Sequence, residues 1–352
     1  MKGKRSGHSL IGVDVGRRTI KAAQLLRADG AYHVSALSAL PRPETERDVS
    51  EADALALKEI FRRQGFVGRG VVLAAPEDRL MEAALELPAK VADAPVEQIV
   101  RMEMSRLHGV APDSFEMAYW EFRGANGSRP LMQTLAVGCP HAAANDFLDV
   151  FEKAGFRVAA LDVRIAAATR ACGPLLLAAP QITAVVDLGW RCTSVLFVCG
   201  TSIIYERSLQ AAALGELTSK LMEAFKIPFE SAYQILGAVG PIPEELPQTY
   251  DRESLDAIRK HTTTHFDRLL DELEVPLSYA NHQFAGEGVR RVLLIGGGAA
   301  VPQLAPYFEK RLGVEVRRAS PCDLLDTPPA LTMKAGNPTL TVALGLAMSG
   351  GI

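Results

Sequence analysis

With 352 residues, the chain is long enough to fold into two lobes, each with its own hydrophobic core. Hydrophobic residues make up 48% of the chain and charged residues 22%, proportions that exclude disordered and collagen-like proteins. The formal net charge of −3 is not gathered into a basic block, which argues against a nucleic-acid-binding protein.

The opening segment predicts three strands, a helix and a fourth strand. Residues 9–40 alternate apolar runs with turns, as SLIGVDVG, TIKAAQLLRA and AYHVSALSAL, a pattern typical of a β-meander. EADALALKEIFRRQG predicts a helix over residues 51–65, and GVVLAAP predicts a buried strand at residues 70–76. Because Asp14 and Arg17 interrupt the apolar residues that follow the basic start, we expect no export signal.

The pattern changes over residues 77–160. A strand, ALELP, precedes a helix, VEQIVRMEMSRLHG, two strands, SFEMAYWEFRG and LMQTLAVGCP, and a second helix, HAAANDFLDVFEKAGF. We interpret this range as an inserted α/β subdomain, after which VAALDVRIAAATRAC returns the chain to the first lobe. Met102, Met104 and Leu107 are expected to lie in a core or a groove of this subdomain.

The second half repeats the opening theme. ITAVVDLGWRCTSVLFVCGTSIIYERSL, residues 182–209, again has an apolar run, an Asp-x-Gly turn and two further strands. Residues 214–290 are mostly helical in pattern, and RRVLLIGGGAAVPQLAPYFEKRLG adds a buried strand, three glycines and a helix. This internal duplication predicts two similar lobes that face one another across a cleft.

The two Asp-x-Gly turns can both carry phosphate chemistry. Asp14 with Gly16, and Asp187 with Gly189, lie where a strand ends in a turn. A glycine there lets backbone N–H groups approach an anion, and the carboxylate can hold a hydrated cation. Together they can clamp phosphates from both sides with Mg²⁺ between them.

The triple glycine Gly296, Gly297 and Gly298 follows the strand VLLI and precedes a predicted helix. Free N–H groups at a helix start favour phosphate or ribose oxygens. The alternative is a tight turn that lets the helix pack on the sheet, and the motif by itself does not decide between the two.

In this order, the three glycine motifs resemble the phosphate-1, phosphate-2 and adenosine motifs of the actin and sugar-kinase superfamily. Within it, the chain is similar to the PilM family of type IV pilus assembly proteins, which is close to the cell-division protein FtsA. The resemblance covers nearly the whole chain, and its main segments are IGVDVGRRTIKAAQL, LAVGCPHAAANDFLDVFEKAGFRVAALDV, ITAVVDLGWRCTSVLF, FESAYQIL and VLLIGGGAAVPQLAPYFEKRLGVEVRRASP.

The resemblance implies an α/β, actin-like (ribonuclease H-like) two-lobed fold with duplicated β-meander and helix lobes. The implied division is subdomain 1A at residues 9–76 and 161–181, a 1C-type insertion at 77–160, subdomain 2A at 182–213 and 291–352, and subdomain 2B at 214–290.

The resemblance also implies ATP in the cleft. Asp14 and Asp187 would hold Mg²⁺ through water, and Asp162 would orient the attacking water. The groups expected to face the nucleotide are Gly16, Arg17, Lys21 and Gly189 at the phosphates and Gly296, Gly297 and Gly298 at the adenosine.

Two of these residues have plainer alternatives. Lys21 can be a solvated strand residue, and Asp162 can cap the helix that follows it, since aspartate is a favoured N-cap residue.

The sequence also departs from the family at the expected site. In the two turns, larger residues replace small ones: Arg17, Arg18, Trp190, Arg191 and Cys192. In the segment FESAYQIL, Tyr233 and Leu236 stand where relatives carry Glu and Lys. Bulk can crowd a triphosphate, whereas an arginine can bind phosphate by its planar fork. The nucleotide site is therefore expected to be partly degenerate, with at most a weak ATPase activity.

The function implied by the resemblance is that of a cytoplasmic scaffold. It would dock the N-terminal tail of a PilN-like inner-membrane protein in a groove between subdomains 1A and 1C, by strand addition or apolar pockets. We expect a location peripheral to the inner membrane through this partner, with no direct membrane insertion; a link to the pilus motor platform and self-association are left open. The alternatives are a sugar-type kinase of the same superfamily and a cytoplasmic component of a type II secretion platform.

Overall fold

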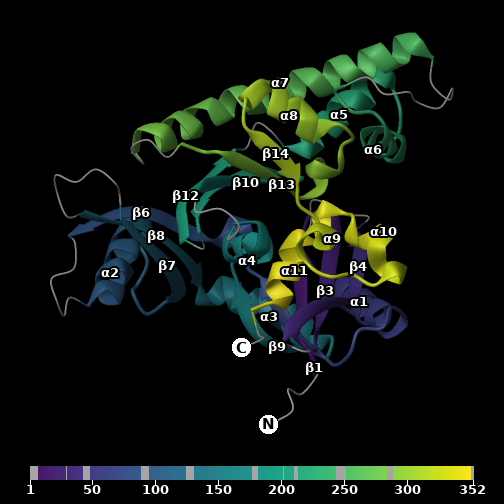
Figure 1. Cartoon of the computed structure of the whole chain (residues 1–352). Coiled ribbons are helices and arrows are strands. Elements are labelled where there is room, and N and C mark those ends of the chain that lie inside the picture. Colours follow the sequence, from purple (N-terminus) through teal and green to yellow (C-terminus); the bar gives the residue numbers. More distant parts are fainter. Residues whose placement is uncertain are drawn as a thin grey trace.

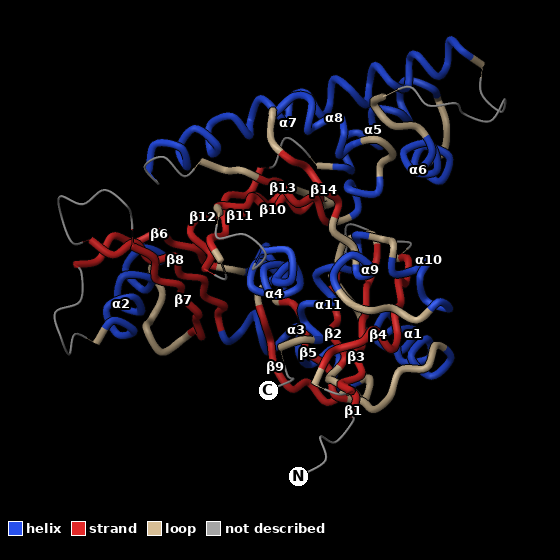
Figure 2. The backbone as a smooth tube through the Cα atoms, viewed as in Figure 1, coloured by secondary structure: helices blue, strands red, loops and turns tan. Residues whose placement is uncertain are grey.

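The computed structural model describes residues 7–28, 30–42, 48–88, 95–123, 131–176, 181–200, 202–209, 213–242, 251–283 and 288–349. Figure 1 shows two lobes, one above the other, with a smaller body of strands and one helix to their side. The long helix α7 lies along the outside of the second lobe, and the same arrangement of helices around sheets is visible in Figure 2.

The first lobe is built on a sheet that begins with the predicted meander. β2, β3 and β4 pair antiparallel, β5 pairs parallel with β2, and β9 pairs parallel with β5. The short β1 pairs with the far end of β3. The bounds are β1 Gly7–His8, β2 Ile11–Val15, β3 Thr19–Ala28, β4 Ala31–Pro41, β5 Gly70–Ala74 and β9 Arg157–Asp162.

The sheet of the second lobe repeats this topology. β10, β11 and β12 pair antiparallel, β13 pairs parallel with β10, and β14 pairs parallel with β13. The bounds are β10 Ile182–Leu188, β11 Thr193–Cys199, β12 Ser202–Leu209, β13 Arg291–Ile295 and β14 Glu315–Arg318. The duplication predicted from the two Asp-x-Gly segments is confirmed, and the described chain has the expected two-lobed α/β architecture.

Between the two sheets lie helices α4 and α11, which share one core with both of them. Their contact is close enough to require a glycine, because a Cβ on Gly345 of α11 would lie 1.8 Å from the carbonyl oxygen of Ala167 on α4. Elsewhere, α1 begins at a capping box formed by Ser50 and Asp53. The helices are α1 Glu51–Arg63, α2 Val96–His108, α3 His141–Lys153, α4 Arg164–Leu176, α5 Leu214–Phe225, α6 Phe229–Ala238, α7 Arg252–Gln283, α8 Leu304–Leu312, α9 Pro321–Leu324, α10 Thr332–Ala335 and α11 Thr341–Ala347.

The smaller body is a three-stranded antiparallel sheet covered by α2. Its order is β6-β8-β7, with bounds β6 Met81–Pro88, β7 Phe115–Arg123 and β8 Leu131–Pro140. Met104 is buried in its core, whereas Met102 is 60% exposed and Leu107 is 51% exposed on the outer face of α2. Of these three residues, Met104 lies in the core, and a groove position for Met102 and Leu107 stays a prediction.

Helix α3 falls within the range 77–160 but belongs by packing to the first lobe. Phe147 and Phe151 on α3 share a core with strands of the first sheet and with α1. The exact subdomain limits stay a prediction. The boundary between the first lobe and the smaller body therefore runs between α3 and the three-stranded sheet.

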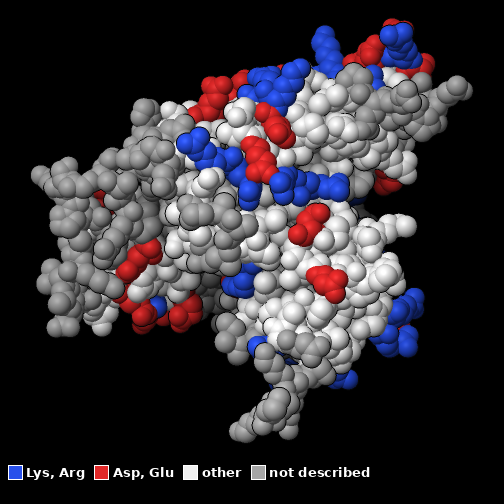
Figure 3. All heavy atoms as spheres, in the orientation of Figure 1, with Lys and Arg blue, Asp and Glu red and all other residues white. Residues whose placement is uncertain are grey.

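Across the described residues, no helix carries an apolar run long enough to cross a bilayer. On the face shown in Figure 3, acidic and basic side chains are interspersed over the second lobe, and uncharged surface covers much of the first.

Candidate functional site: the cleft between the lobes

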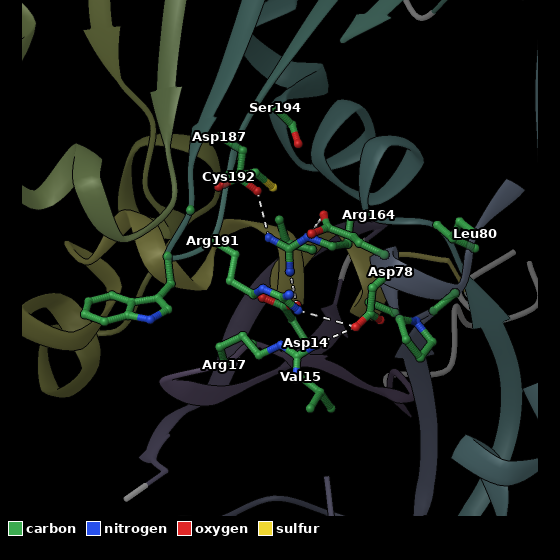
Figure 4. Close-up of a pocket in the computed structure, with 18 of the residues that line it drawn as sticks. Asp14, Val15, Arg17, Asp78, Leu80, Arg164, Asp187, Arg191, Cys192 and Ser194 are labelled. Atoms are coloured by element: carbon green, nitrogen blue, oxygen red, sulfur yellow. Dashed lines mark hydrogen bonds and ion pairs between the residues drawn. The ribbon is translucent and has the colours of Figure 1, made fainter. Parts of the chain in front are cut away.

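A cavity of about 620 Å³ lies between the two lobes, and the smaller body contributes to its wall. Its size is within the range of small-molecule sites in proteins. The two Asp-x-Gly turns and the first two glycines of the triple-glycine turn line it, so the structure brings these predicted groups together. Figure 4 shows the central charged residues of this cleft.

Asp14 comes near the end of β2 and is 1% exposed. The antiparallel register places it opposite Lys21 on β3, whose Nζ donates to Asp14 Oδ2 at 2.8 Å. Burial by itself raises the pKa of Asp14, but the attraction of Arg164 and Lys21, with their hydrogen bonds, outweighs burial and holds this pKa below its ordinary value. Lys21 is 8% exposed, so its alternative as a solvated strand residue is wrong.

Asp187 holds the same position on β10 in the second lobe and is 7% exposed. Its neighbour across the antiparallel pair is Ser194 on β11, so no lysine faces it there. Arg164 supplies its positive partner instead, donating from Nη2 to Asp187 Oδ2 at 2.8 Å. Asp187 Oδ1 is buried without a hydrogen-bond partner among the described residues.

Arg164, the first residue of α4, lies between the two aspartates (Figure 4). Its Nη1 donates to Asp14 Oδ1, and its Nε lies 2.7 Å from Glu77 Oε1. Burial alone lowers the pKa of Arg164, but the charges of Asp14, Glu77 and Asp187 outweigh burial and raise this pKa well above its ordinary value. The guanidinium is therefore a permanent cation at the centre of the cleft.

Glu77 precedes β6, in a short 3₁₀ turn at Glu77–Arg79. The Glu77 side chain is 46% exposed. Its partial removal from water raises the pKa of Glu77 above the ordinary value; the attraction of Arg164 opposes this rise, and the charges of Asp187 and Asp14 add to it. Neither Arg164 nor Glu77 was predicted from the sequence as a site residue. The one available signal was an arginine two residues after Asp162 in the mostly apolar segment VAALDVRIAAA.

The arginines of the two turns bind protein groups at the cleft mouth. Arg17 from the first lobe donates to Asp78 at 2.5 Å, and Arg191 from the second lobe donates to the same carboxylate oxygen at 3.4 Å (Figure 4). Arg18 reaches across the cleft and stacks its guanidinium over the ring of Phe229 on α6, 3.7 Å from the ring centre. These contacts connect the lobes where the resemblance placed phosphates.

Most of the predicted glycines are required by packing of the protein on itself. A Cβ at Gly189 would lie 2.5 Å from the backbone carbonyl oxygen of Cys192, whereas one at Gly16 would lie 2.5 Å from Lys21 Nζ, the end of a flexible side chain that can move aside. Gly296 has a φ of +81°, and a Cβ there would lie 2.1 Å from Asp187 Oδ1. A Cβ at Gly298 would lie 2.7 Å from Leu188 Cβ.

Gly297 differs from these four. A Cβ there would lie 3.8 Å from Leu214 and 3.9 Å from Thr339, so space remains beside its backbone within the cleft. The turn continues as a 3₁₀ segment, Gly297–Ala300, and the predicted helix follows as α8, which begins at Leu304.

Asp162 ends β9 and does not line the described cleft. Its Oδ1 accepts from the N–H of Val163 at 2.8 Å, and its Oδ2 accepts from Arg170 at 3.0 Å. The hydrogen bond to Val163 joins adjacent residues before α4 begins at Arg164 and is not the N2 or N3 contact of an N-cap. A role of Asp162 toward an attacking water stays a prediction. Tyr233 lines the cleft and is 44% exposed, whereas Leu236 is buried.

Comparison with known proteins identifies the family. The model of the type IV pilus assembly protein PilM matches residues 12–350. The chain belongs to this family.

Solved structures agree on the fold. A chain of the PilM–PilN type IV pilus biogenesis complex superposes with a TM-score of 0.77 at 20% identity, over 97% of this chain and 98% of that one. The ethanolamine utilization protein EutJ of Carboxydothermus hydrogenoformans has a TM-score of 0.56 at 17% identity, over 99% of this chain and 92% of its own. MreB5 of Spiroplasma citri bound to ADP has a TM-score of 0.54 at 13% identity, over 96% of this chain and 95% of its own. The family match favours pilus assembly over a sugar-type kinase or a type II secretion component.

The resemblance implied Mg²⁺ between Asp14 and Asp187, and the described residues do not fit that ion. Both oxygens of Asp14 are taken, one by Arg164 and one by Lys21, and Asp187 keeps only Oδ1 unpaired. The described chain also contains no cluster of three or more His, Cys, Asp or Glu arranged to hold a metal. The place expected for the ion is filled by a guanidinium.

Proposed function

We propose that the protein is a scaffold of type IV pilus assembly that docks the N-terminal tail of a PilN-like inner-membrane protein. The observation that carries the proposal is the family match over residues 12–350, supported by a fold shared with the chain from the PilM–PilN complex. On this proposal the protein lies in the cytoplasm and is held at the inner membrane by its partner.

The proposed docking groove is the part of the cleft between α3 and the three-stranded sheet. Apolar side chains from α3 line it on one side, and side chains from β8 and the turn before β6 line it on the other; these are Ala143, Phe147, Val150, Val137 and Leu80. An extended peptide can place alternate side chains in such a groove while its backbone remains available for hydrogen bonds. The sequence-based location between subdomains 1A and 1C corresponds to this boundary.

A labelled peptide with the sequence of the partner's N-terminal tail tests the proposal. Ala143 lines the groove, whereas its neighbour Ala142 is exposed on the same helix and does not line it. Ala143→Arg places a charged side chain in the groove and is expected to weaken peptide binding at least tenfold, or about 1.4 kcal/mol, in fluorescence anisotropy. Ala142→Arg is the matched control and should bind like the wild type.

The outcomes separate two errors. If the peptide binds wild type and Ala143→Arg equally well, docking occurs elsewhere on the surface. If the peptide does not bind the wild-type protein, the scaffold proposal itself fails.

We also propose that the cleft binds ATP weakly, with the adenosine beside Gly297 and with little or no hydrolysis. The space next to Gly297 supports a position for the adenosine there. We expect weak binding because Arg17 and Arg191 already pair with Asp78, which competes with the phosphates for these two arginines. Calorimetric titration with ATP tests this point. Gly297→Val, which fills that space, should abolish the heat of binding, and unchanged heat would contradict the placement.

A further inference from the structure

We propose that Arg164 is the resident cation of the cleft, replacing a divalent metal ion and excluding it. Its guanidinium binds the two aspartates of the duplicated turns and Glu77 at the same time. The proposal rests on these contacts and is independent of where the pilus partner docks.

The three carboxylates come from three parts of the chain. Asp14 belongs to the first lobe, Asp187 to the second, and Glu77 to the turn that leads into the three-stranded sheet. Nη1 and Nη2 donate hydrogen bonds to Asp14 and Asp187, whereas Nε lies 2.7 Å from Glu77 Oε1 as an ion pair without hydrogen-bond geometry. A planar fork with fixed donors suits this arrangement, in which one side chain holds three segments together.

A hydrated divalent ion would have to compete with this side chain for the same oxygens. Arg164 is tethered by its own helix and its charge does not titrate, so it occupies the site at every physiological pH. Lys21 adds a second cation on Asp14. Among the described residues, Asp14 and Asp187 therefore do not form a free carboxylate pair for Mg²⁺ or Mn²⁺ in the wild type.

Removing the guanidinium should reverse this selectivity. Arg164→Ala leaves Asp14, Asp187 and Glu77 around the space vacated by the guanidinium. In their present positions these carboxylates do not form a metal-binding cluster, so a divalent ion would have to draw them together; carboxylate oxygens are the ligands that Mg²⁺ and Mn²⁺ prefer. The variant is thus expected to gain a divalent cation site, and bound metal should restore part of the stability lost with the arginine.

The experiment is thermal unfolding of the full-length protein in EDTA and in millimolar MgCl₂ or MnCl₂, without nucleotide. The wild type should melt at the same temperature in all three. Arg164→Ala should melt roughly 5 °C or more below the wild type in EDTA and recover a large part of that loss with Mn²⁺. Arg170→Ala, which removes another α4 arginine that pairs with an acidic residue outside the cleft, is the matched control and should show no response to metal.

Two further variants keep the test decisive. Arg164→Gln retains a polar side chain of similar length and serves if the alanine variant does not fold; Mn²⁺ binding to it is read by electron paramagnetic resonance. Arg164→Gln combined with Asp187→Asn should lose the gained site. Metal stabilisation of the wild type as large as that of the variants, or folded variants that bind no Mn²⁺, would overturn the proposal.

Discussion

The two lobes have the same strand order and strand directions, but their equivalent aspartates have different neighbours. Asp14 lies opposite Lys21 on the adjoining strand, and Asp187 lies opposite Ser194. The first lobe therefore supplies a cation for its own carboxylate, while the second depends on Arg164 of α4. The duplication preserved a backbone plan, and the difference in side chains made the second lobe depend on a residue outside its own sheet.

The largest expected effect that tests this comparison is the loss of the lysine in the first lobe. Lys21→Met leaves the buried Asp14 with one cation in place of two, and should lower the free energy of unfolding by about 3 kcal/mol at pH 7 in urea titrations. The equivalent change in the second lobe, Ser194→Ala, should stay within about 0.5 kcal/mol. Equal losses of unfolding free energy in the two variants would show that Lys21 and Ser194 contribute equally to stability.

The pH dependence of the Lys21→Met effect has a defined sign. The folded pKa of Asp14 lies below its ordinary value, so its ion pairs contribute stability that is fully present above pH 4 and is lost as the pH falls through the folded pKa. The difference in unfolding free energy between wild type and Lys21→Met should therefore be largest at about pH 5 to 7 and should shrink below about pH 4. A difference that grows in acid would contradict the assignment.

The turn glycines come next in expected size. An added Cβ at Gly189 meets the backbone carbonyl of Cys192, which cannot move easily, whereas one at Gly16 meets the flexible end of Lys21. Gly189→Ala should cost about 2 kcal/mol of unfolding free energy and Gly16→Ala less than about 1 kcal/mol. Thermal unfolding of the two variants side by side measures this, and the reverse order would show that the first turn is the more rigid one.

A pair of carboxylates where the second lobe meets the smaller body gives a third test. Burial, followed by the neighbouring Glu82 carboxylate and its hydrogen bond, raises the pKa of Glu206 to about 8. A raised folded pKa means that the folded state holds a proton that the unfolded state has lost, so stability falls as the pH rises from about 4.5 to about 8.

Glu206→Gln removes this titration. Its stability should change less than that of the wild type over the same pH range, with a relative gain of about 1.5 kcal/mol at high pH after solvent screening is allowed for. If the free energy of unfolding changes by the same amount with pH in wild type and variant, Glu206 does not hold a proton in the folded state at neutral pH. Glu206→Asp, which keeps a titratable carboxyl group, is the control.

The smallest effect concerns the contact of Arg18 with the second lobe. Arg18→Ala removes the guanidinium from the ring of Phe229 and should lower the free energy of unfolding by about 1 kcal/mol. Arg18→Lys keeps the charge but not the planar stacking, and should lose part of that amount. If Arg18→Ala is as stable as the wild type, the contact between Arg18 and Phe229 does not contribute to the free energy of unfolding.

The backbone plan could be predicted from the sequence because it is encoded locally. Two Asp-x-Gly segments with similar apolar runs predicted two similar sheets, and both Asp14 and Asp187 line one cavity as expected. The glycine positions were also found, but most are explained by packing against neighbouring residues rather than by a ligand.

The position of the Arg164 guanidinium between the two aspartates could not be predicted, because it depends on contacts between segments that are distant in the sequence. Arg164 is 150 residues from Asp14 in the sequence, and nothing local indicates that its guanidinium reaches both lobes. Arg17 was expected to face phosphates, but its partner, Asp78, comes from a separate turn. Helix α3 was assigned to the insertion by its position in the chain, whereas its buried phenylalanines pack on the first lobe.

The most direct test is the affinity of the proposed PilN-like tail peptide with and without a metal-bound nucleotide. If the lobes are held together by Arg164, the peptide should bind the nucleotide-free protein in EDTA as tightly as it does in MgCl₂ and ATP, within about twofold, or 0.4 kcal/mol. Binding that appears only with Mg²⁺ and ATP would contradict the account, because it would mean that an added ion and ligand, and not the protein's own guanidinium, assemble the cleft.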